Sequence, residues 1–182
     1  MLDLPRPRLA GDKATVIACP MSDEQCALQE ALVARYEAIR AGQVKPWEDN
    51  ALAITTDGRK LVLDARLLSA TAADVPDSKI NALVAHVTAI WKRTMARRGT
   101  QLIFADLGVH PTPWGYAVYE EVITKLVQHG IPRQEIAAIG DADTDAKKQV
   151  LFEKVRQGSV RILLGKMFQR CWSAMLFGYT RV

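Results

Sequence analysis

The sequence predicts a three-layer α/β fold, in which a parallel sheet lies between helices, preceded by an N-terminal helical segment. Three apolar runs rich in strand-forming residues, at 101–105, 136–139 and 160–164, alternate with two segments whose apolar residues recur at helical spacing. Such a βαβαβ unit has parallel strands and right-handed crossovers. The chain has 182 residues, 49% apolar and 24% charged, which suits one compact domain with a helical appendage. This composition excludes wholesale disorder, a fibrous repeat and a disulfide-rich mini-scaffold.

Residues 1–76 are predicted to combine helix and irregular chain, packed against the α/β core or projecting from it. Residues 1–20 are rich in proline around a short apolar stretch, which predicts irregular structure. Ser22, followed by Gln25, gives a capping-box pattern that begins a helix, and Gly42 ends it. Its apolar residues, at positions 28, 32, 36 and 39, recur at helical spacing.

A connector is expected over residues 43–68, with a turn at Asp57-Gly58. Residues 69–76 are small and polar and end in a proline, which is typical of a hinge. The sequence shows no internal repeat, so we expect one α/β core after this hinge.

The α/β core is expected over residues 77–165. Glycines follow its last two predicted helices, where they suit the helix ends. Besides the three strands, the predicted elements are a helix capped by Asp77 or Ser78 and ending in the basic run 92–98, and helices at 116–130 and 146–157.

Charge and cysteine content set the expected compartment and partners. The 24 basic and 20 acidic residues give a net charge of +4, and the pI near 9.0 hints at nucleic acid. The three cysteines, Cys19, Cys26 and Cys171, have no metal-site spacing, and their odd number indicates a reducing compartment. With no signal-peptide pattern and no apolar run long enough for a membrane span, we expect a cytoplasmic protein with no membrane partner.

Ligands of parallel α/β sheets gather at the carboxyl ends of the strands. Here those ends are residues 106–108, 140–145 and 165–166. The acidic loop from Asp141 resembles the opening of an EF-hand but has Phe152 where the twelfth-position glutamate belongs, so calcium is not expected. Instead, Thr144 or Asp145 would cap the following helix.

The chain contains no phosphate-binding loop, no dinucleotide-binding glycine pattern and no serine nucleophile elbow. The three histidines lie on different predicted elements, and no catalytic residue is assigned. One remaining enzymatic alternative is a hydrolase in which Asp106 and Asp141 hold Mg²⁺ at neighbouring strand ends.

Five segments, in order, carry a resemblance to a known family: residues 77–79, 99–106, 139–148, 152–158 and 160–165. They resemble the C-terminal RecA-like domain of superfamily 2 helicases, most closely the Swi/Snf-like branch. The stretch 48–67 and the phrase 141–148 are similar to helicase and methylase-associated proteins of phages and integrative elements. The resemblance covers roughly residues 5–165.

The resemblance implies a DNA partner and, in the parent family, ATP and Mg²⁺ bound between two RecA-like domains. By analogy, the loops after the first and third strands and the turn before the last helix face the phosphate backbone. Lys147 and Lys148 would be phosphate contacts, or else a solvated helix face. The nucleic-acid-binding residues implied are Asp106, Thr144, Lys147, Lys148 and Gly165.

The chain departs from the family after Gly165, where the rest of motif V and motif VI would follow. The first RecA-like domain is also absent. We therefore expect a helicase fragment, inactive alone, without a complete ATP site and with residual nucleic-acid binding at most. A frameshift near codon 165 would leave a divergent tail over residues 166–182, helical from Met167 to Phe177.

The alternative is a non-catalytic interaction module whose apolar tail docks a partner or closes a homodimer. Phe168, Trp172, Phe177 and Tyr179 supply the aromatic anchors for this. Three basic residues and no acidic ones fall in residues 166–182, which leaves +1 over residues 1–165. The basic pI is therefore no argument for DNA binding.

Overall fold

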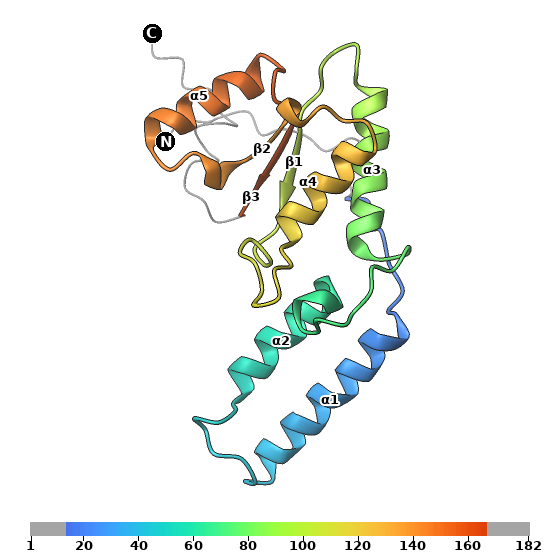
Figure 1. Cartoon of the computed structure of the whole chain (residues 1–182), viewed down its shortest axis with the longest axis vertical. Helices are drawn as coiled ribbons and strands as arrows, with labels where there is room; N and C mark the ends of the chain where they lie inside the picture. The colour runs from blue at the N-terminus through green and yellow to red at the C-terminus, as the bar shows by residue number, and fades with distance from the viewer. Residues whose placement is uncertain (1–13, 167–182) are drawn as a thin grey trace.

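The computed structural model describes residues 14–166, which form five helices, three strands and three short 3₁₀ turns (Figure 1). The helices are α1 (Asp23–Arg40), α2 (Ala51–Leu63), α3 (Lys79–Arg93), α4 (Val118–Gln128) and α5 (Asp145–Arg156). The strands are β1 (Gln101–Phe104), β2 (Ile136–Ala138) and β3 (Ile162–Gly165), and the 3₁₀ turns are η1 (Ala65–Leu67), η2 (Arg133–Glu135) and η3 (Ile139–Asp141). The expected tail and its helix at 167–177 lie outside the described residues.

The three strands form one parallel sheet in the order β1-β3-β2, which confirms the α/β prediction. The chain passes from β1 over β3 to β2 through α4, and it returns to β3 through α5. Because the second crossover runs back across the sheet, crossovers of one hand put α4 and α5 on opposite faces. The register sets Phe104 beside Gly165 and Ala138 beside Leu164.

Helices flank the sheet (Figure 1), and each face of the sheet is covered by its own apolar cluster. On one face, α3 and α4 pack against Ile103, Ile162 and Leu164. On the other, α5 packs Phe152 and Val155 against Leu163. The buried strand β3 is apolar on both faces, as expected for the central strand of a parallel sheet.

Helices α1 and α2 form an antiparallel hairpin that projects from the α/β unit (Figure 1). The predicted capping box is confirmed, since the Ser22 side chain accepts from the Gln25 N–H and the Gln25 side chain accepts from the Ser22 N–H. The predicted end of the helix at Gly42 is confirmed as well, because Gly42 has a φ of +70° just past the last helical turn.

The turn predicted at Asp57-Gly58 is wrong, because helix α2 continues through both residues. Asn50 begins this helix by accepting from the Ala53 N–H at 3.0 Å. The Asp57 carboxylate accepts from Arg35 of α1 at 2.9 Å rather than from its own backbone. Glycine costs a helix interior about 1 kcal/mol, which packing against α1 offsets here.

The remaining boundaries follow the sequence closely. Ser78, one of the two predicted caps, accepts from the Asn81 N–H, and α3 ends at Arg93, inside the basic run. Residues 14–20 are irregular, as expected. No helix within residues 14–166 is long and apolar enough to cross a membrane.

Candidate nucleic-acid interface at the carboxyl edge of the sheet

We define the carboxyl edge as the chain that follows each strand: residues 105–108, 139–144 and 165–166. The strand order brings Asp106 and Gly165 together, because β1 and β3 are neighbours and Phe104 is the register partner of Gly165. Asp106 is exposed and Gly165 is buried. Two of the five predicted site residues therefore lie at adjacent strand ends.

The loop after β1 is closed onto helix α4 by Gly108. Its carbonyl accepts from the Val118 N–H at 2.8 Å and from the Tyr119 N–H at 3.4 Å. It thereby satisfies helix N–H groups that the cap residue Ala117 leaves without a side-chain acceptor. Gly108 has a φ of +70°, and a Cβ atom there would lie 2.3 Å from Val118 Cγ2. This position therefore requires glycine.

A cavity of about 260 Å³ opens at the carboxyl edge between α4 and η3. Ionisable side chains of both signs line it, and they come from the loop after β1, from α4, η2 and η3, and from the end of β3: His110, Glu120, Arg133, Asp141 and Lys166. The cavity is thus polar, with no single charge sign.

Tyr119 lies in the wall of this cavity and binds the loop beside it. Its hydroxyl donates to the Ala105 carbonyl at 2.9 Å. Burial, assisted by the charge of Asp106, raises the pKa of Tyr119 to about 12. Tyr119 therefore stays neutral and holds the end of β1 against α4 at ordinary pH.

The other three predicted residues lie at the start of helix α5. The Thr144 side chain caps the helix by accepting from the Lys147 N–H at 3.3 Å. Lys147 pairs with Asp143 at 2.8 Å, and Lys148 pairs with Asp145 at 3.2 Å. Exposed pairs of this kind contribute at most about 1 kcal/mol, so a phosphate could replace either carboxylate.

The two groups of predicted residues are connected through Asp141. This residue lines the cavity at the carboxyl edge and also lines a shallow apolar groove in which Lys147 lies. The predicted site thus forms two neighbouring patches, one at the ends of β1 and β3 and one at the start of α5.

The Mg²⁺ alternative is wrong in its premise, because Asp106 and Asp141 do not follow neighbouring strands. Strand β3 lies between β1 and β2, which separates their ends by two strand spacings, about 10 Å. Within residues 14–166, no group of three or more His, Cys, Asp or Glu side chains is arranged to hold a metal ion.

Charge is distributed unevenly between the helical segment and the α/β unit that follows it, although the total for residues 1–165 is only +1. Residues 79–165 hold 12 basic and 8 acidic residues, whereas residues 14–78 hold 6 basic and 10 acidic residues. The charge of +1 over residues 1–165 therefore divides into a basic α/β unit and an acidic helical segment before it. Much of the basic excess lies in residues 92–98, at and just after the end of α3, whereas Asp141, Asp143 and Asp145 lie at or just before the start of α5.

Sequence reasoning missed a polar cluster that joins the hairpin to the α/β unit. Arg66 pairs with Asp64 at 2.8 Å, within the same segment, and with Glu121 of α4 at 2.8 Å. The Tyr116 ring stacks on the Arg66 guanidinium, 4.5 Å from its centre, and the Tyr116 hydroxyl donates to Asp64 at 2.9 Å. Lys125 and Asp74 extend the cluster. The sequence feature that could have indicated this cluster is the family-like stretch 48–67, which contains both Asp64 and Arg66.

Within this cluster Arg66 stays charged and the Tyr116 hydroxyl stays neutral. Burial alone would lower the pKa of Arg66, but hydrogen bonds to Asp64 and Glu121 more than offset burial and raise it. Burial and the Asp64 charge raise the pKa of Tyr116, so its hydroxyl remains a donor. The cluster therefore acts as a fixed joint over the ordinary pH range.

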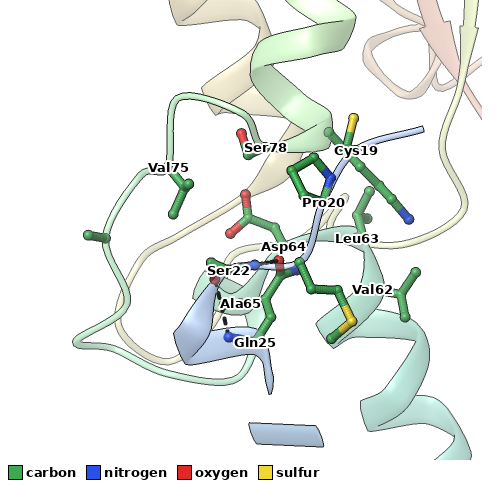
Figure 2. Close-up of a pocket in the computed structure, with 13 residues that line it drawn as sticks. Cys19, Pro20, Ser22, Gln25, Val62, Leu63, Asp64, Ala65, Val75 and Ser78 are labelled. Atoms are coloured by element: carbon green, nitrogen blue, oxygen red, sulfur yellow. Dashed lines mark hydrogen bonds between the residues drawn. The ribbon is translucent and has the colours of Figure 1, made fainter. Parts of the chain in front are cut away.

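A small cavity of about 100 Å³ lies beside this joint (Figure 2). Figure 2 shows Ser22 and Gln25 at the start of α1, with Asp64 and Ser78 around the same space. Their polar groups have partners: Ser22 and Gln25 bond each other, Gln25 donates to the Leu61 carbonyl at 2.8 Å, and Ser78 caps α3. This cavity belongs to the joint.

The opposite, amino edge of the sheet is closed by a second cluster that the sequence did not reveal. Arg161 is 1% exposed and donates to the Trp91 carbonyl at 2.7 Å and to Thr94 Oγ1 at 3.1 Å. Glu135 accepts from the Trp91 indole at 2.7 Å and pairs with Arg161 at 3.5 Å. Because these groups are used within the fold, the carboxyl edge is the better candidate for a ligand.

Comparisons of the chain with protein-family models, curated proteins and solved structures give no match.

Proposed function

We propose that residues 77–165 are the nucleic-acid-binding half of an ATP-dependent DNA translocase, the C-terminal RecA-like domain of a superfamily 2 helicase. One observation carries the proposal: the family-like segments fall, in order, on β1 and its end, on η3 and the start of α5, and on β3. In an open α/β sheet these are positions from which ligands are bound.

The start of α5 supports phosphate binding in two ways. The helix N-terminus carries partial positive charge, and Lys147 and Lys148 add two cations in its first turn. Both lysines can exchange an exposed carboxylate partner for a phosphate.

ATP does not fit the described part of the chain as a self-contained site. The cavity at the carboxyl edge sets Glu120 and Asp141 beside Arg133 and Lys166, and two carboxylates would face any bound triphosphate. The family resemblance puts ATP between two domains. We therefore propose DNA binding for this chain, assign no catalytic residue, and derive no step through ATP or Mg²⁺.

Fluorescence anisotropy with labelled single-stranded and duplex DNA tests the proposal on the full chain. The double variant Lys147→Ala/Lys148→Ala should weaken binding about tenfold at roughly 50 mM salt, whatever the DNA sequence. The matched control is Lys92→Ala/Arg93→Ala, which removes the same charge from exposed positions at the end of α3, near the amino edge. Absence of binding, or equal weakening by both variants, would contradict the proposal.

A further inference from the structure

An apolar groove of about 600 Å³ lies between α1 and α2 and includes Leu107 from the loop after β1. Its apolar lining comes from the residue before Ser22, from α1 and α2, and from the loop after β1: Met21, Leu32, Leu61, Val62 and Leu107. Met21 is 42% exposed and Val62 is 51% exposed, and Arg59 is the one ionisable residue that the described chain contributes to the lining. Contiguous apolar surface of this kind is normally covered by a partner.

We propose that the C-terminal segment of this same chain, residues 167–182, docks into this groove. The segment follows Lys166 directly after β3, at the carboxyl edge. Gly165 is the register partner of Phe104, and Leu107 lies only three residues beyond Phe104. One strand spacing plus three residues amounts to at most about 15 Å, whereas 16 extended residues reach more than about 50 Å.

The composition of the segment suits the groove. It contains eight large apolar or aromatic residues: Met167, Phe168, Trp172, Met175, Leu176, Phe177, Tyr179 and Val182. It also carries Arg170 and Arg181 and no acidic residue. Aromatic anchors of this type dominate the energetics of buried interfaces.

The net charge of the hairpin also favours residues 167–182 as the segment that binds it. The helical part over residues 14–78 has 10 acidic and 6 basic residues, and exposed acids recur every seven residues along α1, at Asp23, Glu30 and Glu37. This net negative charge attracts a basic segment to the hairpin as a whole. These acidic residues of α1 lie on a different face from Gln29 and Leu32, and the groove itself contributes Arg59, so burial of apolar side chains rather than ion pairing would hold the segment there. A tether this short also raises its effective concentration at the groove to about the millimolar range, well above that of a second molecule.

This inference is independent of DNA binding. It assigns the segment an intramolecular role, covering the apolar side of the projecting hairpin.

Limited trypsin digestion of the full chain tests the docking, because Arg170 is a cleavage site within the segment. Val62→Lys introduces a charge into the groove at a half-exposed position and should speed cleavage at Arg170 about tenfold. The control is Val150→Lys, a 57% exposed valine on α5 outside the groove, which should leave the cleavage rate unchanged. Equal cleavage rates in both variants and the parent chain would overturn the proposal.

Disulfide trapping gives a second measurement that does not depend on a charged substitution. In a chain with Cys19→Ser and Cys26→Ser, oxidation should link native Cys171 to a cysteine introduced by Val62→Cys, and not to one introduced by Val150→Cys. The expected product is an intramolecular link whose yield does not depend on protein concentration. A linked dimer would show that a second copy fills the groove, and no link would show that the segment stays away; either result overturns the proposal.

Discussion

Gly108 constrains the carboxyl edge through its backbone and through its lack of a side chain. We predict that Gly108→Ala lowers the free energy of unfolding by about 3 kcal/mol, because it combines a left-handed backbone with a clash against Val118. Gly115→Ala is the control, since Gly115 has a φ of +86° but no atom within 4 Å of an added Cβ. It should cost only about 1 kcal/mol. If urea denaturation shows equal losses of unfolding free energy for Gly108→Ala and Gly115→Ala, the proposed clash is contradicted.

Tyr119 gives the fold a measurable sensitivity to alkali. Its pKa of about 12 lies above the ordinary value of 10.0, so folding favours the neutral phenol. The corresponding stability is fully present below pH 10 and is lost as the pH rises through 12. We predict that the wild-type free energy of unfolding falls more steeply than that of Tyr119→Phe between about pH 10 and 12. Parallel pH profiles would show that burial does not shift this group.

Single residues were predictable where their partners are close in sequence. The caps at Ser22, Ser78 and Thr144 each bind a backbone N–H three residues ahead, so the local pattern was sufficient. Arg66 and Arg161 were not predictable in the same way. Their partners lie 55 and 67 residues away, at Glu121 and Thr94 respectively, and only the fold brings them together.

At the scale of elements, the joint between the hairpin and α4 depends on Arg66. We predict that Arg66→Met lowers the free energy of unfolding by about 3 kcal/mol, because it leaves Asp64 buried without its cation. Hydrogen exchange should also rise in η1 and in the first turns of α4, beside Glu121. Arg66→Lys retains the charge but not the forked geometry, and it should recover part of the stability. An unchanged exchange pattern in Arg66→Met would argue against the joint.

At the start of α5, a substitution is expected to strengthen DNA binding rather than weaken it. Asp143 and Asp145 hold the two lysines that we assign to phosphate. We predict that Asp143→Asn/Asp145→Asn tightens DNA binding several-fold, because it removes two negative charges and frees both lysines. The helix should lose about 0.5 kcal/mol, since Asp145 also complements its dipole. Weaker or unchanged binding, measured by anisotropy, would show that the lysines do not meet phosphate.

Element types were largely predictable, whereas their arrangement was not. The apolar periodicity gave the three strands and four of the five helices. Helix α2 was missed because Asp57-Gly58 is a good turn sequence, and only the pairing of Asp57 with Arg35 of α1 favours a helix there. Strand order depends on contacts between segments about 60 residues apart in the sequence, as between β1 and β3, so the separation of Asp106 from Asp141 was invisible in the sequence.

The whole molecule combines a basic α/β unit with an acidic projecting hairpin (Figure 1). The moderate net charge of the whole chain therefore conceals two parts of opposite net charge. This separation also explains why overall pI was a poor guide, since opposite charges in the two parts nearly cancel before the C-terminal segment adds its own.

The salt dependence of DNA binding shows whether Lys147 and Lys148 contact phosphate. Each phosphate contact on duplex DNA contributes about 0.9 to the slope of log affinity against log salt concentration. We predict a salt-dependent wild-type affinity whose slope falls by about 1.8 in Lys147→Ala/Lys148→Ala and stays unchanged in Lys92→Ala/Arg93→Ala. Affinity that does not respond to salt, or an equal change of slope in both variants, would contradict this prediction.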